Sequence, residues 1–205
     1  MFKKDTSFKL KLIFMKHIAS AVAFLHQNDV IHRDLKPDNI MMSRNNRQGR
    51  VTAKIGDFGT AKIAADSGYE GVLYNYYMDT SRAGTLFFIA PEVLDGRSTE
   101  RADIFSMGVV FAAILIDEPV QEMGQSFMGA AYGEDMCGGL ISIADALRRG
   151  RDPYGLDPGV GPCRERQVVE DMLSLEHHER PTAAQVKREI SACLRTHMRS
   201  LYGAY

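Results

Sequence analysis

The sequence lacks several features that would assign it to large classes of protein. Its longest apolar run, Met107 to Ile116, is too short to cross a bilayer, so membrane insertion is not expected. Its cysteines, Cys137, Cys163 and Cys193, are odd in number and have no metal-ligand spacing. That pattern favours free thiols in a reducing compartment. We therefore expect the protein in the cytoplasm, and nothing in the sequence excludes the nucleus.

The sequence also lacks an excess of charge of either sign. Its 25 Lys and Arg residues nearly balance its 26 Asp and Glu residues, which gives a formal net charge of -1. This balance argues against nucleic acid or an anionic membrane as the main partner. The local basic cluster at residues 148–151 is interpreted as a solvated loop. At 205 residues and 45% hydrophobic content, the chain is long enough to form one domain with a real core.

Apolar residues recur at helical spacing in the first part of the chain. They predict a helix from about Ser7 to Gln27, followed by a short buried strand at residues 30–31. Two strand-like runs at residues 40–42 and 51–55, separated by a turn, predict a hairpin.

The second half of the chain is predicted to be helical. A helix is expected from Ser98 or Thr99 to about Ile116, a short one near residues 141–149, and another over 167–175. A capping box at residues 182–185 opens a last helix, which has Val186 and Ile190 on one face. The predicted fold class is therefore mainly α, a helical bundle with one small β-hairpin.

The octapeptide His32-Arg33-Asp34-Leu35-Lys36-Pro37-Asp38-Asn39 has the residue types that phosphoryl transfer needs. The carboxylate of Asp34 can orient an incoming hydroxyl and take its proton. Lys36 can place an ammonium on the transferring phosphate, and Asn39 offers a neutral oxygen suited to Mg²⁺. Asp34 and Lys36 are therefore candidate catalytic residues.

Three further motifs follow in order. Asp57-Phe58-Gly59 stands 23 residues after Asp34 at the end of the predicted hairpin, and Gly84-Thr85 and Ala90-Pro91-Glu92 come later. In this order and spacing, the set resembles the catalytic domain of serine/threonine protein kinases. The resemblance covers about residues 7 to 195 and is weakest from 117 to 163.

The resemblance implies a protein-kinase-like fold in which residues 1–205 are the C-lobe portion of the domain, with the hairpin beside the catalytic loop. It implies ATP and Mg²⁺ as cofactors, with Lys36 on the phosphates and with Asn39 and Asp57 as the metal ligands. Thr85 is the third catalytic residue and hydrogen-bonds Asp34 and Lys36. The presence of Lys36 two residues after Asp34 resembles serine/threonine kinases rather than tyrosine kinases.

The resemblance also implies structural and regulatory roles. Glu92 forms a buried ion pair with Arg180, and Asp103 accepts hydrogen bonds from the backbone around His32 and Arg33. His32 packs against Phe58, beside Gly59, and is not a catalytic base. Arg33 receives a phosphate added at Thr80 or Ser81 of the activation loop. The implied partners are protein substrates and an upstream kinase, with no nucleic acid.

The first 31 residues contain no glycine, and the first glutamate is Glu70. In the family, a glycine-rich loop and a lysine paired with a helix glutamate precede the catalytic loop. We therefore expect residues 1–205 alone to have little or no kinase activity.

Three interpretations remain open. One is the C-lobe of an active kinase that needs a missing N-lobe. Another is a non-catalytic, stand-alone lobe that acts as a protein-binding or regulatory module. The last is a small-molecule phosphotransferase, which ranks lowest because Lys36, Gly84-Thr85 and Ala90-Pro91-Glu92 are typical of protein kinases.

Overall fold

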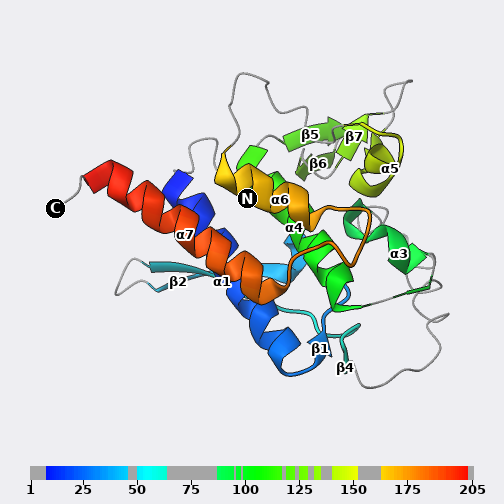
Figure 1. Ribbon diagram of the computed structural model, residues 1–205, viewed down its shortest axis with the longest axis horizontal. Helices are drawn as coiled ribbons and strands as arrows, with labels where there is room; N and C mark the ends of the chain where they lie inside the picture. The colour runs from blue at the N-terminus through cyan, green and yellow to red at the C-terminus, as the bar shows by residue number, and fades with distance from the viewer. Residues whose placement is uncertain are drawn as a thin grey trace.

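The protein is described by a computed structural model that covers residues 8–45, 50–63, 87–94, 96–97, 99–116, 119–122, 125–128, 132–134, 140–151 and 163–202. The helices are α1 (Phe8–Gln27), α3 (Pro91–Leu94), α4 (Glu100–Ile116), α5 (Ile143–Arg148), α6 (Arg164–Met172) and α7 (Ala183–Tyr202), with a 3₁₀ turn, η1 (Pro37–Asn39). The predominance of helix confirms the mainly α class that the sequence predicts (Figure 1).

The strands form four antiparallel pairs within these ranges. They are β1 (Val30–Ile31) with β4 (Lys62–Ile63), β2 (Ile40–Asn45) with β3 (Arg50–Ile55), β5 (Pro119–Glu122) with β6 (Gln125–Met128), and β7 (Tyr132–Glu134) with β8 (Leu140–Ser142). The predicted hairpin is β2–β3, and the prediction of a single hairpin is wrong. The other pairs have strands of two to four residues, too short to show an alternating pattern.

Helix α4 lies at the centre of the core. Thirteen of its 17 residues are buried, so it is enclosed on all sides, as its apolar sequence predicts. A Cβ at Gly108 would lie 3.0 Å from the Cβ of Met172 and 3.1 Å from the side chain of Leu173, so glycine allows α6 to approach α4 closely. In the described part of the chain, no helix combines the length and apolarity needed to span a membrane.

Helices α1 and α7 pack side by side against this core (Figure 1). Leu12, Met15 and Val22 of α1 are fully buried, and each side chain contributes roughly 1.5–3 kcal/mol by leaving water. The apolar face of α7 includes Ile190 and Cys193, and burial raises the pKa of the Cys193 thiol to about 11. At the start of α1, the ring of Phe8 meets the ring of His197 of α7 edge to face, with centroids 5.1 Å apart.

Local hydrogen bonds explain where the helices begin and end. The predicted capping box is present before α7, since Gln185 N donates to Thr182 Oγ1 (3.2 Å) and Thr182 N donates to Gln185 Oε1 (2.7 Å). Helix α6 begins at Arg164, before the predicted start at residue 167, because its first turn is polar and precedes the apolar pattern on which the prediction rests. It ends at Met172, before Ser174 and Leu175, whose carbonyls accept hydrogen bonds from Arg180 (2.8 and 3.4 Å).

Candidate active site

Asp34, Lys36 and Asn39 form a buried, hydrogen-bonded cluster that extends from the loop after β1 to the end of η1. Lys36 Nζ lies 2.8 Å from Asp34 Oδ2 and 3.1 Å from Asp34 Oδ1. Asn39 Nδ2 donates to Asp34 O (2.7 Å) and to Asp34 Oδ2 (3.0 Å). Pro37 at the start of η1 favours the tight turn that brings Asn39 back to Asp34. The structure therefore brings together three of the residues predicted for phosphoryl transfer.

Asp103 of α4 fixes the backbone of the catalytic loop through its carboxylate. Its Oδ2 accepts from His32 N (2.8 Å) and its Oδ1 accepts from Arg33 N (2.8 Å), while only 1% of its surface is exposed. Oδ2 also lies 2.9 Å from Nε2 of His26, in the last turn of α1. The sequence did not identify His26 as part of the site. Its position in the last turn before the loop was the available signal.

The hydrogen bonds of His32 define a packing environment for its ring. Its Nε2 donates to Gly56 O (3.1 Å), and its Nδ1 accepts from Asp34 N (3.3 Å), so both ring nitrogens are used. The ring lies edge to face with Phe58, with centroids 5.1 Å apart. The structure thus places His32 between the catalytic loop and the Asp57-Phe58-Gly59 segment.

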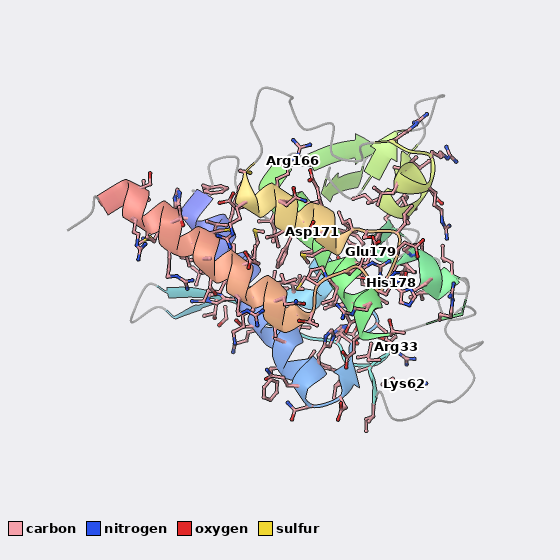
Figure 2. The ribbon with its side chains drawn as sticks, in the orientation of Figure 1. Arg33, Lys62, Arg166, Asp171, His178 and Glu179 are labelled. Carbon is pink, nitrogen blue, oxygen red and sulfur yellow. The ribbon has the colours of Figure 1, made fainter. Side chains whose placement is uncertain are left out.

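Arg33 lies next to Thr60, just beyond the Asp57-Phe58-Gly59 segment. Its backbone has φ 69, in the left-handed region, and its Nε donates to Thr60 O. Thr60 Oγ1 in turn donates to His32 O (3.1 Å), a role that the sequence prediction missed. Figure 2 shows Arg33 and Lys62 near the β1–β4 pair, which joins the strand before the loop to the strand after Asp57.

Asp57 follows β3 on the adjoining segment. Its side chain is exposed, its φ is 55, and its Oδ1 accepts from Gly59 N (3.2 Å). Gly56 N donates to Asn39 O (2.9 Å), which holds the segment against the catalytic loop.

His17 of α1 supports the strand that leads to Asp57. Ala53 N in β3 donates to His17 Nδ1 at 3.3 Å, and this nitrogen can accept only while it is unprotonated. Burial, together with the nearby charge of Lys16, lowers the pKa of His17 below its ordinary value of 6.5. The hydrogen bond from Ala53 N to His17 therefore requires a neutral imidazole.

Glu92 of α3 and Arg180 form a buried ion pair. Arg180 Nη1 and Nη2 donate to the two carboxylate oxygens of Glu92 at 2.6 and 2.9 Å. The guanidinium also lies 4.9 Å from the centroid of the Phe105 ring in α4. The pair joins α3 to the segment before α7, which is 88 positions away in the sequence.

Three of the predicted residues lie outside the described part of the chain. They are Thr85, predicted to contact Asp34 and Lys36, and the predicted phosphate acceptors Thr80 and Ser81. Their roles stay predictions.

Comparison with known protein families shows that residues 4–190 match the protein kinase domain. Because this match spans most of the 205 residues, the chain belongs to the protein kinase domain family. The resemblance predicted from the sequence motifs is confirmed at the level of the kinase family. Protein kinases transfer phosphate to protein substrates and generally use ATP and Mg²⁺.

Proposed function

We propose that this chain is the C-lobe portion of a serine/threonine kinase, which transfers the γ-phosphate of ATP to Ser or Thr hydroxyls of protein substrates. The observation that supports this most directly is the buried cluster of Asp34, Lys36 and Asn39. Lys36 and Asn39 each donate a hydrogen bond to the Asp34 carboxylate, and the backbone of the preceding residues is fixed by Asp103. Such preorganised positioning supplies most of the catalysis in phosphoryl transfer.

In this proposal Asp34 orients the substrate hydroxyl and accepts its proton. The hydroxyl oxygen forms the new bond to the γ-phosphorus, and the bond from that phosphorus to the β-phosphate oxygen breaks. Lys36 Nζ, 2.8 Å from Asp34 Oδ2, is close enough to the carboxylate to contact the transferring phosphate beside it. Thr85 completes the catalytic set by contacting both side chains.

The oxygen ligands of the site suit Mg²⁺. Asn39 donates to Asp34 through its amide nitrogen, so its amide oxygen remains for a metal, and the Asp57 carboxylate is exposed. The described residues include no cluster of three His, Cys, Asp or Glu side chains for a metal, so phosphate and water oxygens would complete the coordination. Bound Mg²⁺ would neutralise phosphate charge during transfer.

We further propose that turnover needs a glycine-rich loop and a strand lysine that residues 1–31 do not include. In the described part of this segment, residues 8–27 form α1 and residues 30–31 form β1. These elements support the catalytic loop, and neither has the sequence of a phosphate-covering loop. The alternative of a non-catalytic binding module is not favoured, since the catalytic loop retains Asp34, Lys36 and Asn39.

The test is a phosphorylation assay on the protein immunoprecipitated from its own cells, with labelled ATP and Mg²⁺ and with matched peptides that offer Ser, Thr or Tyr. We expect transfer to Ser and Thr, and a loss of about 10²–10⁴-fold in Asp34→Asn. Asp171→Asn on α6 (Figure 2) makes the same change at an exposed position and should keep the activity. Equal activity in Asp34→Asn, or transfer to Tyr alone, would refute the assignment.

A parallel assay uses the recombinant 205-residue chain. Slow turnover by this chain, together with active immunoprecipitated protein, supports the need for further nucleotide-binding elements. Fast turnover by the 205-residue chain would overturn that part of the proposal and leave the catalytic assignment intact.

A further inference from the structure

Charge is distributed unevenly over the fold, although the chain is nearly neutral. Helices α1 and α7, which lie side by side (Figure 1), have seven basic residues between them and a single acidic residue, Glu189. The whole chain has a net charge of -1, so the remainder is strongly acidic. The Glu189 carboxylate accepts two hydrogen bonds from Arg164 of α6, at 2.6 and 2.9 Å, and is therefore already neutralised by that partner.

Three of the basic residues form a line along the exposed side of α7. Arg188, Arg195 and Arg199 are spaced by seven and four positions, which places them on one helical face, and all three are exposed. We call them the arginine stripe. In the described part of the chain, none of these three side chains has an ion-pair partner. Three like charges within about three turns repel one another, so the stripe favours an anionic partner.

The surroundings of the stripe identify the class of that partner. A helix that binds a membrane surface inserts its apolar face into the lipid. Here that face, including Val186 and Ile190, is buried inside the protein. Proteins that bind single-stranded nucleic acid stack bases on aromatic side chains, whereas the positions between the arginines on this face are occupied by Ala192 and Thr196. An acidic protein segment needs neither feature.

We propose that the arginine stripe binds an extended, acidic segment of a partner protein. At about 1.5 Å per helical residue, the arginines lie about 10 and about 6 Å apart along the axis. An extended peptide advances about 3.3 Å per residue and its side chains alternate between two faces, so acidic residues at positions i, i+2 and i+6 share one face and lie about 7 and about 13 Å apart. When the peptide runs antiparallel to α7, this spacing matches that of the arginines to within about 3 Å, which their long, flexible side chains can span. Each guanidinium can bind a carboxylate with two parallel hydrogen bonds. This surface is independent of the catalytic residues.

The test uses a fluorescein-labelled peptide with Glu at positions i, i+2 and i+6, titrated with the 205-residue chain at about 0.1 M salt, where the Debye length is about 10 Å. We expect saturable binding that weakens roughly tenfold in the double variant Arg195→Gln and Arg199→Gln, which loses two exposed ion pairs. The control is Arg149→Glu, an exposed residue after α5. It lowers the net charge by the same two units and should leave the affinity unchanged.

The remaining outcomes would overturn the proposal. They are no saturable binding of the peptide, equal weakening by Arg149→Glu and by the double variant, and tighter binding of a thymidine oligonucleotide or of phosphatidylserine vesicles that depends on the same two arginines. Thermal melting of each variant checks the fold. Gln is a good helix former, so the melting temperature should not change.

Discussion

Two buried ion pairs of this protein, Glu92 with Arg180 and Asp34 with Lys36, have different surroundings. The first joins segments 88 positions apart. All five N–H groups of Arg180 have acceptors, which are the two Glu92 oxygens and the carbonyls of Ser174, Leu175 and Arg101. The second pair joins residues only two positions apart in one loop.

Under the proposed function, the difference separates a pair that holds the fold from a pair that we expect to serve the chemistry. A fully hydrogen-bonded guanidinium between distant segments has one stable arrangement, and its loss leaves a buried carboxylate unpaired. The Asp34–Lys36 pair brings no distant elements together. In the proposed function, its two groups would exchange part of their contact for a substrate hydroxyl and a phosphate.

The strongest test of this contrast is Arg180→Met. Glu92 is 5% exposed, so removing its partner should lower the free energy of unfolding by about 3–5 kcal/mol. Urea denaturation followed by circular dichroism measures this loss. The double variant with Glu92→Met removes both charges and should recover part of the stability. If the double variant is as unstable as Arg180→Met, packing rather than the unpaired charge is the cause.

Asp103→Asn should have the next largest effect. In the native protein, the two carboxylate oxygens of Asp103 accept hydrogen bonds from the backbone N–H groups of His32 and Arg33. The amide of Asn keeps one oxygen acceptor, and its NH₂ group would face the other backbone N–H group. One buried donor then lacks a partner, at a cost of about 1–3 kcal/mol. Denaturation curves measure the loss, and Asp171→Asn, at an exposed position, should show none. Unchanged stability in Asp103→Asn would contradict this role.

Lys36→Met should affect stability less than Arg180→Met does. Asp34 keeps its hydrogen bond from Asn39 at 3.0 Å, so we expect a loss of about 1–2 kcal/mol in the free energy of unfolding. The same variant should abolish most phosphoryl transfer in the immunoprecipitated protein. A stability loss as large as that of Arg180→Met would remove the contrast between the two pairs.

The smallest effect concerns His17 and pH. Because burial lowers its pKa, the unfolded chain binds this proton more readily than the folded protein does. The contribution of His17 to stability is therefore complete above about pH 6.5, the ordinary pKa, and is lost as the pH falls through the lower pKa of the folded state. Denaturation at several pH values should show less pH dependence in His17→Asn, whose amide oxygen can still accept from Ala53 N. The same pH dependence in both proteins would contradict this.

The sequence predicted the elements whose pattern is long and periodic. Helices α1, α4 and α7 and the β2–β3 hairpin follow from apolar spacing and from capping residues such as Thr182. The four strands β5 to β8 were missed, because strands of three or four residues have no clear period.

Within the site, the sequence motifs identified the candidate residues, and the kinase resemblance implied the distant contacts of Glu92 with Arg180 and of Asp103 with the loop backbone, both of which the structure contains. Contacts outside those motifs were not identified. His26 and Thr60 were missed, since each acquires its role from a partner 77 or 28 positions away. A polar side chain on an apolar helix face indicates a buried partner, yet nothing local to His26 identifies that partner as Asp103. Only the packing of α1 against α4 brings the two together.

The pairing of β1 with β4 also bears on the dynamics of the molecule. Val30 pairs with Ile63 and Ile31 with Lys62, so residues 30–63 form one closed loop that includes Asp34, Lys36, Asn39 and Asp57. Because both strands have only two residues, this closure is the part of the loop with the fewest ladder hydrogen bonds. Amide hydrogens at this junction should exchange with solvent sooner than those of α4, as expected for local opening below the global unfolding free energy. A ligand that contacts both the residues after β1 and Asp57 would slow that exchange. The rate of amide exchange at the β1–β4 junction should therefore report whether a ligand is bound.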